Sequence, residues 1–92
     1  MDWKGKVAVV TGASSGIGLA VSKAFVQRGV AVALVARTEA KLQAVAQALG
    51  GKTAAFALDV TDRTALEALP SRVRDYFGRL DFVVNSAGVN HR

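Results

Sequence analysis

Residues 11–18 read Thr-Gly-Ala-Ser-Ser-Gly-Ile-Gly and set the interpretation of the whole chain. They lie between a short apolar run and a segment whose apolar residues recur at helical spacing. A turn without side chains lets the backbone amides at the start of a helix approach an anion, and the helix dipole favours negative charge there. Gly12 permits a tight exit from the strand, Gly16 close approach of a phosphate, and Gly18 close packing of helix on sheet. We therefore expect a turn that binds a pyrophosphate.

Outward from this turn, short apolar runs alternate with longer helical stretches, which is the pattern of βα units around a parallel sheet. The runs are almost entirely apolar, as expected for strands that helices cover on both faces. Right-handed crossovers place such strands in the order 3-2-1-4. The sequence thus predicts an α/β fold, a Rossmann-like doubly wound parallel sheet that is incomplete, with four strands at Lys6 to Thr11, Val30 to Ala36, Thr53 to Leu58 and Leu80 to Asn85.

Three helices are predicted between these strands. The first presents Ile17, Ala20, Val21, Ala24 and Phe25 on its apolar side, with Ser22, Lys23 and Gln27 on the other, and stops at Gly29. The second runs from Glu39 to Leu49, with Thr38 as N-cap and Gly50-Gly51 at its end. The third covers Arg63 to Phe77, where Pro70 removes an amide donor and predicts a kink or two short helices.

Composition narrows the class of protein. The chain has 92 residues, of which 51% are hydrophobic and 21% charged, so we expect one globular unit with one core. The net charge of +5 comes from basic residues scattered among acids, which argues against nucleic-acid binding. There is no cysteine and a single histidine, His91, so no metal site is expected. No apolar run approaches the roughly 20 residues of a membrane span, and we expect a soluble, cytoplasmic chain without a signal peptide.

Two further motifs follow predicted strands. Asp59-Val60 comes after the third, and Asn85-Ser86-Ala87-Gly88 closes the fourth. With Thr-Gly-x-x-x-Gly-Ile-Gly after the first strand, the chain resembles the short-chain dehydrogenase/reductase family, and the resemblance covers the N-terminal half of that family. It implies that residues 1–92 are the N-terminal part of a single NAD(P)-binding Rossmann domain. It also implies that Asp59 hydrogen-bonds adenine beside a hydrophobic wall and that the Asn85 turn supports the sheet along the cofactor, with Ser86 replacing the family's second Asn.

The cofactor preference depends on the end of the second strand, Val35-Ala36-Arg37. In NAD-binding sites of this type, an acidic residue about 20 positions beyond the turn accepts hydrogen bonds from the ribose hydroxyl groups. Here Ala36 stands at that position, and Arg37 follows. A guanidinium can bind a ribose phosphate through paired hydrogen bonds, so NADP(H) is expected over NAD(H), although the turn lacks the basic residue that some NADP-preferring relatives carry. The alternative is that Arg37 is a solvated loop cation. The candidate cofactor-binding residues are Gly12, Ser14, Ser15, Gly16, Ile17, Gly18, Arg37, Thr38, Asp59, Val60, Asn85, Ala87 and Gly88.

The chemistry that the resemblance implies is hydride transfer between the nicotinamide and a small-molecule carbonyl or alcohol. The family's acid/base group is the Tyr of a Tyr-x-x-x-Lys motif, whereas Tyr76 is followed four residues later by Leu80. No catalytic residue is therefore assigned, Tyr76 is interpreted as part of a helix face, and the chain alone is expected to be inactive. Part of one apolar sheet face and the outer edge of the last strand, with Phe82, Val83 and Val84, should remain open.

Three interpretations remain. The first is that the chain is the cofactor-binding portion of an NADP(H)-dependent oxidoreductase that is a homo-oligomer when complete. The second is a non-catalytic dinucleotide-binding module, or a subunit that needs a second chain. The third is a hydrolase, because Gly12-Ala13-Ser14-Ser15-Gly16 also satisfies Gly-x-Ser-x-Gly and is followed by Asp81 and His91. Trp3 is expected to be a packing anchor, and Asp81 a surface or capping carboxylate.

Overall fold

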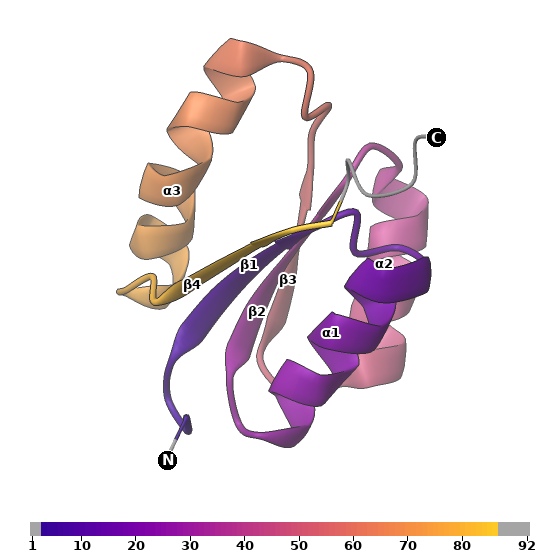
Figure 1. Cartoon of the computed structure of the whole chain (residues 1–92), viewed down its shortest axis with the longest axis vertical. Helices are drawn as coiled ribbons and strands as arrows, with labels where there is room; N and C mark the ends of the chain where they lie inside the picture. Colours follow the sequence, from indigo (N-terminus) through magenta and orange to yellow (C-terminus); the bar gives the residue numbers. More distant parts are fainter. Residues whose placement is uncertain (1–2, 87–92) are drawn as a thin grey trace.

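The computed structural model describes residues 3–86 as a single parallel sheet with helices on both faces (Figure 1). Hydrogen-bonded neighbours follow the order β3-β2-β1-β4, which confirms the predicted 3-2-1-4 arrangement. The second and third helices have the predicted bounds, whereas each predicted strand is one or two residues too long at one end. The elements are β1 (Val7–Thr11), α1 (Gly16–Gln27), β2 (Ala31–Ala36), α2 (Glu39–Leu49), β3 (Thr53–Ala57), α3 (Arg63–Phe77) and β4 (Phe82–Asn85).

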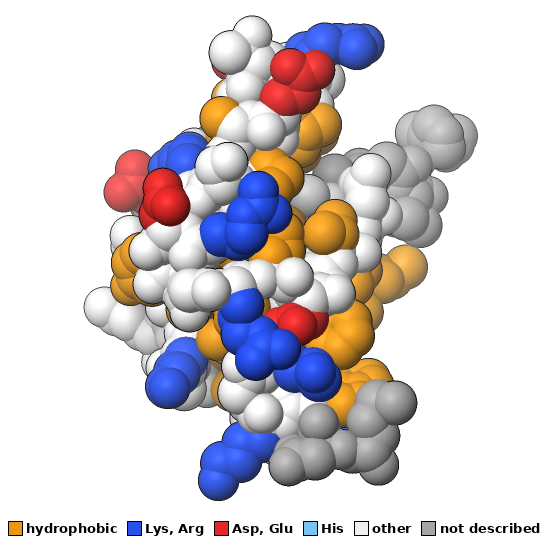
Figure 2. Space-filling model, turned by 90° about the vertical axis from the view of Figure 1, so that its left-hand side faces the viewer, with side chains coloured by type: hydrophobic (Ala, Val, Ile, Leu, Met, Phe, Trp, Pro, Cys, Tyr) orange, Lys and Arg blue, Asp and Glu red, His pale blue; other side chains and the backbone are white. Residues whose placement is uncertain are grey.

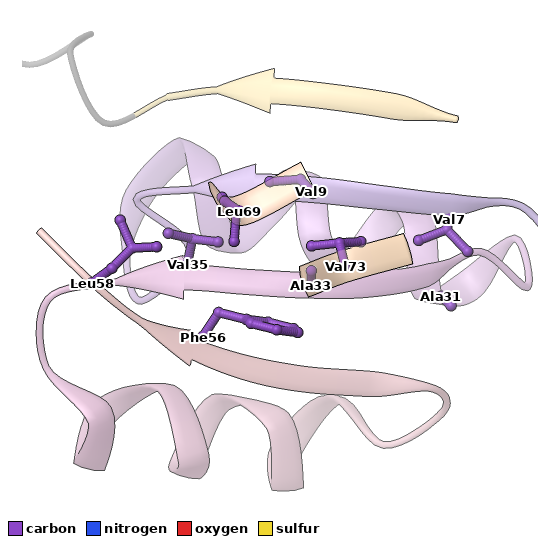
Figure 3. Packing of buried hydrophobic residues seen from close by; sticks show 9 residues of the cluster. All are labelled: Val7, Val9, Ala31, Ala33, Val35, Phe56, Leu58, Leu69 and Val73. Carbon is purple, nitrogen blue, oxygen red and sulfur yellow. The ribbon is translucent and has the colours of Figure 1, made fainter. Parts of the chain in front are cut away.

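The sheet separates two apolar clusters. Helices α1 and α2 lie on one face and α3 on the other (Figure 1). All five residues of β1 and the first five of β2 are buried, and their side chains alternate between the two faces. On the α3 face, side chains from β1, β2 and β3 pack with Leu69 and Val73 (Figure 3). The two central strands therefore carry the core and hold the carboxyl edge of the sheet in place.

Only part of the predicted apolar side of helix α1 packs against the sheet, namely Phe25 and the partly buried Val21. Its buried residues are Gly18, Ser22 and Phe25, while Ile17 is 53% exposed and Ala20 and Ala24 are also exposed. Ser22 is completely buried because its hydroxyl donates a 2.8 Å hydrogen bond to the carbonyl of Gly18, one turn earlier. The assignment of Ser22 to the outer side was wrong, because Gly18 and Ser22 lie one turn apart on the buried side of the helix.

Helix α3 is continuous through Pro70, so the division into two short helices was wrong. Proline removes one backbone hydrogen bond, but Leu69 and Val73 on either side are buried against the sheet and hold the helix there. At its start, the carboxylate of Asp62 accepts a hydrogen bond from the backbone N–H of Ala65 at 3.2 Å. At its end, Gly78 adopts a left-handed conformation with φ of 90° and donates to the carbonyl of Arg74.

The outer part of the α3 face is open, as predicted. Val83 of β4 is 65% exposed and Leu66 of α3 is 38% exposed. Between these elements lies a mostly apolar cavity of about 240 Å³. Phe82 points to the opposite face, where its ring stacks on Phe25 at 5.7 Å and meets Trp3 at 5.4 Å. The open edge is therefore narrower than predicted, and Trp3 is confirmed as a packing anchor.

Charged side chains do not form one continuous patch on the face that Figure 2 shows. On the face that Figure 2 shows, Lys and Arg side chains lie in separate groups with acidic, apolar and uncharged groups between them. Within residues 3–86, no helix is long and apolar enough to cross a bilayer. The same residues hold no group of three or more His, Cys, Asp or Glu side chains that could bind a metal ion.

Asp81 fixes the start of β4 against β1. One carboxylate oxygen accepts the backbone N–H of Val7 at 2.8 Å, and Arg79 binds both oxygens, at 2.9 and 2.8 Å. The hydrogen bonds from Arg79, followed by the one from Val7, hold the pKa of Asp81 below its ordinary value of 3.8. This carboxylate therefore stabilises the fold above the pKa of the unfolded chain, and its contribution is lost as the pH falls through the lowered pKa of the folded state.

We expect Asp81→Asn to be less stable than the unmodified chain at pH 6 and to lose less stability on acidification. Urea-unfolding curves recorded by circular dichroism between pH 6 and pH 2.5 measure both effects. Asp75→Asn, which removes an exposed carboxylate from α3, is the matched control. Parallel pH profiles for the unmodified chain and Asp81→Asn would contradict this role for Asp81.

Candidate functional site

The glycine turn lies at the carboxyl edge of the sheet, directly after β1. Gly12 and Gly16 have φ of 65° and 58°, the left-handed region that glycine adopts without steric cost. The backbone N–H of Ala13 donates to the carbonyl of Val35 and ties the turn to the end of β2. Ser15 is the N-cap of α1, with an extended backbone, and its side chain makes no capping bond. Because the first turn of a helix leaves N–H groups without intrahelical partners, this turn presents donors to an anion, and no acidic residue stands in the first turn of α1.

Gly18 brings α1 against both the turn and the end of β4. A Cβ atom at Gly18 would lie 2.1 Å from the carbonyl oxygen of Gly12 and 2.7 Å from the hydroxyl oxygen of Ser86. Such distances leave no space for any side chain. The helix packing expected of Gly18 is confirmed, and the contact extends to Ser86 at the end of β4.

Thr11 connects the ends of β1 and β4. Its hydroxyl donates to the side-chain oxygen of Asn85 at 2.8 Å and accepts the backbone N–H of Ser86 at 3.1 Å. The hydroxyl of Ser86 donates to the carbonyl of Thr11. Serine fits at this position because its short side chain reaches back to β1 while leaving α1 close to the turn.

One cavity of about 360 Å³ lies at this edge, within the range of about 300 to 1,000 Å³ usual for small-molecule sites. It brings together nine of the predicted residues: Gly12, Ser14, Ser15, Ile17, Gly18, Arg37, Thr38, Asp59 and Val60. Five further lining residues were not among the predicted ones: Ala36, Lys41, Leu58, Thr61 and Ser86. Four of these adjoin predicted residues in the sequence, whereas Lys41 lines the cavity because one helical turn brings it beside Thr38.

The remaining predicted residues are placed differently. Gly16 belongs to the turn but does not line the cavity. Asn85 supports Thr11 and lines the apolar cavity on the α3 side of the sheet, in keeping with the supporting role expected of its turn. Ala87 and Gly88 lie outside the described residues.

Asp59 is held in one orientation on the cavity wall. One of its oxygens accepts both the backbone N–H of Thr61, at 2.9 Å, and the hydroxyl of Thr61, at 2.7 Å. The hydroxyl bond is the main cause, with the N–H bond next, of a pKa for Asp59 below the ordinary value. The other oxygen lies 4.0 Å from Nε of Arg37. The carboxylate is thus an ionised hydrogen-bond acceptor, suited to an amino group on a ligand.

Arg37 stands at the mouth of the cavity. Its side chain is 78% exposed, and the 4.0 Å ion pair with Asp59 is of the weak, solvent-exposed kind. A ligand phosphate could therefore replace this contact at small cost. Arg37 follows Ala36, which lines the cavity where NAD-type sites carry a carboxylate.

The structure separates the residues of the hydrolase interpretation. Ser14 follows the carboxyl end of β1, whereas Asp81 binds Val7 at the other end of the sheet. The two cannot share one active site, and His91 lies outside the described residues. Tyr76 is also remote from the turn, since it lies near the end of α3 and its ring packs on Phe77 at 4.7 Å. Its interpretation as part of a helix face is confirmed.

At the carboxyl edge of this Rossmann-like sheet, a glycine turn, the exposed Arg37 and the hydrogen-bonded Asp59 lie around one cavity. This arrangement defines a dinucleotide-binding type of site. The sequence profile of the short chain dehydrogenase family matches residues 6–92, and the chain belongs to this family. The prediction made from the three motifs is confirmed.

Individual relatives agree with this assignment. An uncharacterized oxidoreductase of Staphylococcus epidermidis is 47% identical over 85 residues, which cover 92% of this chain and 37% of that protein. A metagenomic short-chain oxidoreductase solved with NADP has a TM-score of 0.88 and 40% identity, covering 96% of this chain and 41% of that one. L-sorbose reductase from Gluconobacter frateurii, solved with NADPH and L-sorbose, has a TM-score of 0.87 and 41% identity, covering 96% and 36%. The chain thus spans about two fifths of the length of these relatives.

Proposed function

We propose that this chain is the cofactor-binding portion of an NADP(H)-dependent oxidoreductase that transfers hydride between the nicotinamide and a small carbonyl or alcohol. The cofactor preference rests on the cavity residues at the end of β2. Ala36 stands where NAD-type sites carry a carboxylate, and Arg37 and Thr38 follow it. Two solved relatives with 40% and 41% identity hold NADP or NADPH, which supports the same preference. The complete enzyme would act in the cytoplasm as a homo-oligomer, without nucleic acid or membrane as partners.

The shape of the site fits such a cofactor. The glycine turn and the start of α1 would hold the pyrophosphate, with Ser14 and Ser15 as further donors. Asp59 would accept a hydrogen bond from the amino group of adenine, and Val60 would form part of the apolar wall beside the adenine ring. Arg37 would bind the phosphate on the adenosine ribose through charge-assisted hydrogen bonds. When bound, the cofactor supplies or accepts the hydride; the residues of this chain bind and orient it.

The family's Tyr-x-x-x-Lys motif is absent from these 92 residues, because the single tyrosine, Tyr76, is followed four positions later by Leu80. Tyr76 also lies at the other end of the sheet from the cavity. A non-catalytic binding module remains the second candidate. The closed core on the α1 and α2 face favours a chain that folds by itself. The exposed Val83 and Leu66 favour a chain that needs further covering on the other face.

The test is a titration of the purified chain with NADPH and with NADH, followed by cofactor fluorescence and thermal shift together. We expect saturable binding of NADPH that is at least about tenfold tighter than that of NADH, because one hydrogen bond to a charged group contributes about 1.5 to 3 kcal/mol. No carbonyl reduction is expected from this chain alone. Equal affinities would contradict the NADP(H) preference, and a folded chain that binds neither cofactor would contradict the proposed function.

A further inference from the structure

The mouth of the cavity carries a second basic side chain that the family motifs do not identify. Lys41 lines the same cavity as Arg37 and Thr38. It is the third residue of α2, which begins at Glu39. Its side chain is exposed, so the ammonium group can turn towards a ligand at the cavity mouth.

Nothing within α2 favours a cation at this position. The first turn of a helix is the positive end of its dipole, where a lysine is unfavourable. An acidic residue three or four positions away would offset this charge, but positions 37, 38, 44 and 45 hold Arg, Thr, Ala and Val. The ion pairs formed within residues 3–86 do not include Lys41. Glu39, the acidic residue of α2, stands two positions before Lys41 and therefore does not face it. A bound anion would supply a negative charge on the side of the helix where Lys41 stands.

The neighbouring groups are donors as well. Thr38 is the N-cap of α2, with an extended backbone, but its side chain makes no capping bond. The first intrahelical bond there runs from the N–H of Leu42 to the carbonyl of Thr38, at 3.2 Å, so the N–H groups before Leu42 lack helical partners. Arg37 extends from the residue before this cap. One wall of the cavity thus combines a guanidinium, an ammonium and a hydroxyl.

The opposite wall offers no cation. The glycine turn contributes Ser14 and Ser15 to the cavity and has no basic residue between Thr11 and Gly18. A doubly charged phosphate at the ribose end would therefore find its second positive charge only on α2. Arg37 lies 4.0 Å from Asp59, and Lys41 lines the same cavity.

We propose that Lys41 binds the 2′-phosphate of NADP(H) together with Arg37 and Thr38, and thereby strengthens discrimination against NAD(H). The inference rests on the proposed function, since it assigns one more residue to that site. Arginine would hold the phosphate in a fixed orientation, whereas the flexible lysine acts as a compact charge. Lys41 should therefore contribute to affinity for the phosphate more than to the position of the cofactor.

The test uses ligand fragments as well as complete cofactors. Calorimetric titrations with 2′,5′-ADP and 5′-AMP compare the same adenosine with and without the 2′-phosphate. For Lys41→Met we expect about tenfold weaker binding of 2′,5′-ADP and NADPH, the size of one charge-assisted contact, and an unchanged affinity for 5′-AMP and NADH within twofold. Lys41→Arg should keep most of the affinity. Lys52→Met is the control, because Lys52 is an exposed lysine before β3, at the other end of the sheet.

A stability measurement separates binding from folding. Because Lys41 is unfavourable in the first turn of α2, Lys41→Met should have an unfolding midpoint without ligand equal to or above that of the unmodified chain. Weaker binding of 2′,5′-ADP with no loss of stability supports the proposal. Unchanged binding of 2′,5′-ADP by Lys41→Met, while the unmodified chain prefers NADPH, overturns it and leaves the proposed function intact. Absence of binding by the unmodified chain overturns both.

Discussion

Arg37→Asp is expected to reverse the cofactor preference of this chain. The substitution removes the guanidinium that would bind the ribose phosphate and places a carboxylate one residue after Ala36, near the position where NAD-type sites hold the ribose hydroxyls. Loss of one or two hydrogen bonds to a charged group, at about 1.5 to 3 kcal/mol each, predicts roughly 100-fold weaker binding of NADPH. Binding of NADH should improve, because the new carboxylate can accept hydrogen bonds from two ribose hydroxyl groups.

The measurement is the ratio of the dissociation constants for NADPH and NADH, from cofactor fluorescence at fixed ionic strength. Arg63→Asp makes the same charge change at the same edge of the sheet, at the first residue of α3, which does not line the cavity. It should alter the ratio less than threefold, apart from the general effect of net charge. If the two variants shift the ratio equally, Arg37 acts only through long-range charge and is the solvated loop cation of the alternative interpretation.

The central elements were predictable because their residues leave few choices. Runs such as Val30 to Ala36 are too apolar for any place but the interior of a parallel sheet. The same logic placed the glycine turn and Asp59 at one edge, since the carboxyl ends of parallel strands meet there. Nine candidate residues accordingly line one cavity.

What the sequence did not reveal depends on contacts between distant segments. Ser22 is a polar residue, but its hydroxyl donates a hydrogen bond to the carbonyl of Gly18, so the side chain can be completely buried. A hydropathy pattern therefore assigns Ile17 and Ser22 to the wrong sides of the helix. Lys41 was missed for a related reason, because its role depends on which side of α2 meets the cavity.

Pro70 shows the limit of a local rule. In an isolated helix interior, proline costs about 3 kcal/mol and usually breaks the helix. Here α3 continues, because Leu69 and Val73 pack into the apolar cluster with Val9 and Phe56. Tertiary packing, which acts between segments far apart in the sequence, outweighed the local penalty.

Gly18→Ala is expected to produce the largest loss of stability among single-methyl changes in the site. The new Cβ would meet the backbone carbonyl of Gly12 at 2.1 Å, and a backbone group has no alternative rotamer to adopt. Overpacking a tight interior costs about 1 to 3 kcal/mol, and this contact should reach at least the upper end. Urea unfolding followed by circular dichroism measures the change.

Gly78→Ala is the matched control, since Gly78 has φ of 90° and ψ of −8°, in the left-handed helical region, and a Cβ there would meet nothing within 4 Å. It should show only the cost of a left-handed alanine, about 1 kcal/mol. Gly18→Ala should also weaken NADPH and NADH binding alike, because separating α1 from the turn moves the pyrophosphate donors away from the cavity that Arg37 and Asp59 line. Equal destabilisation by both variants would show that α1 can move away from the turn at little cost in stability. The close packing of α1 against the turn would then not be required for the geometry of the site.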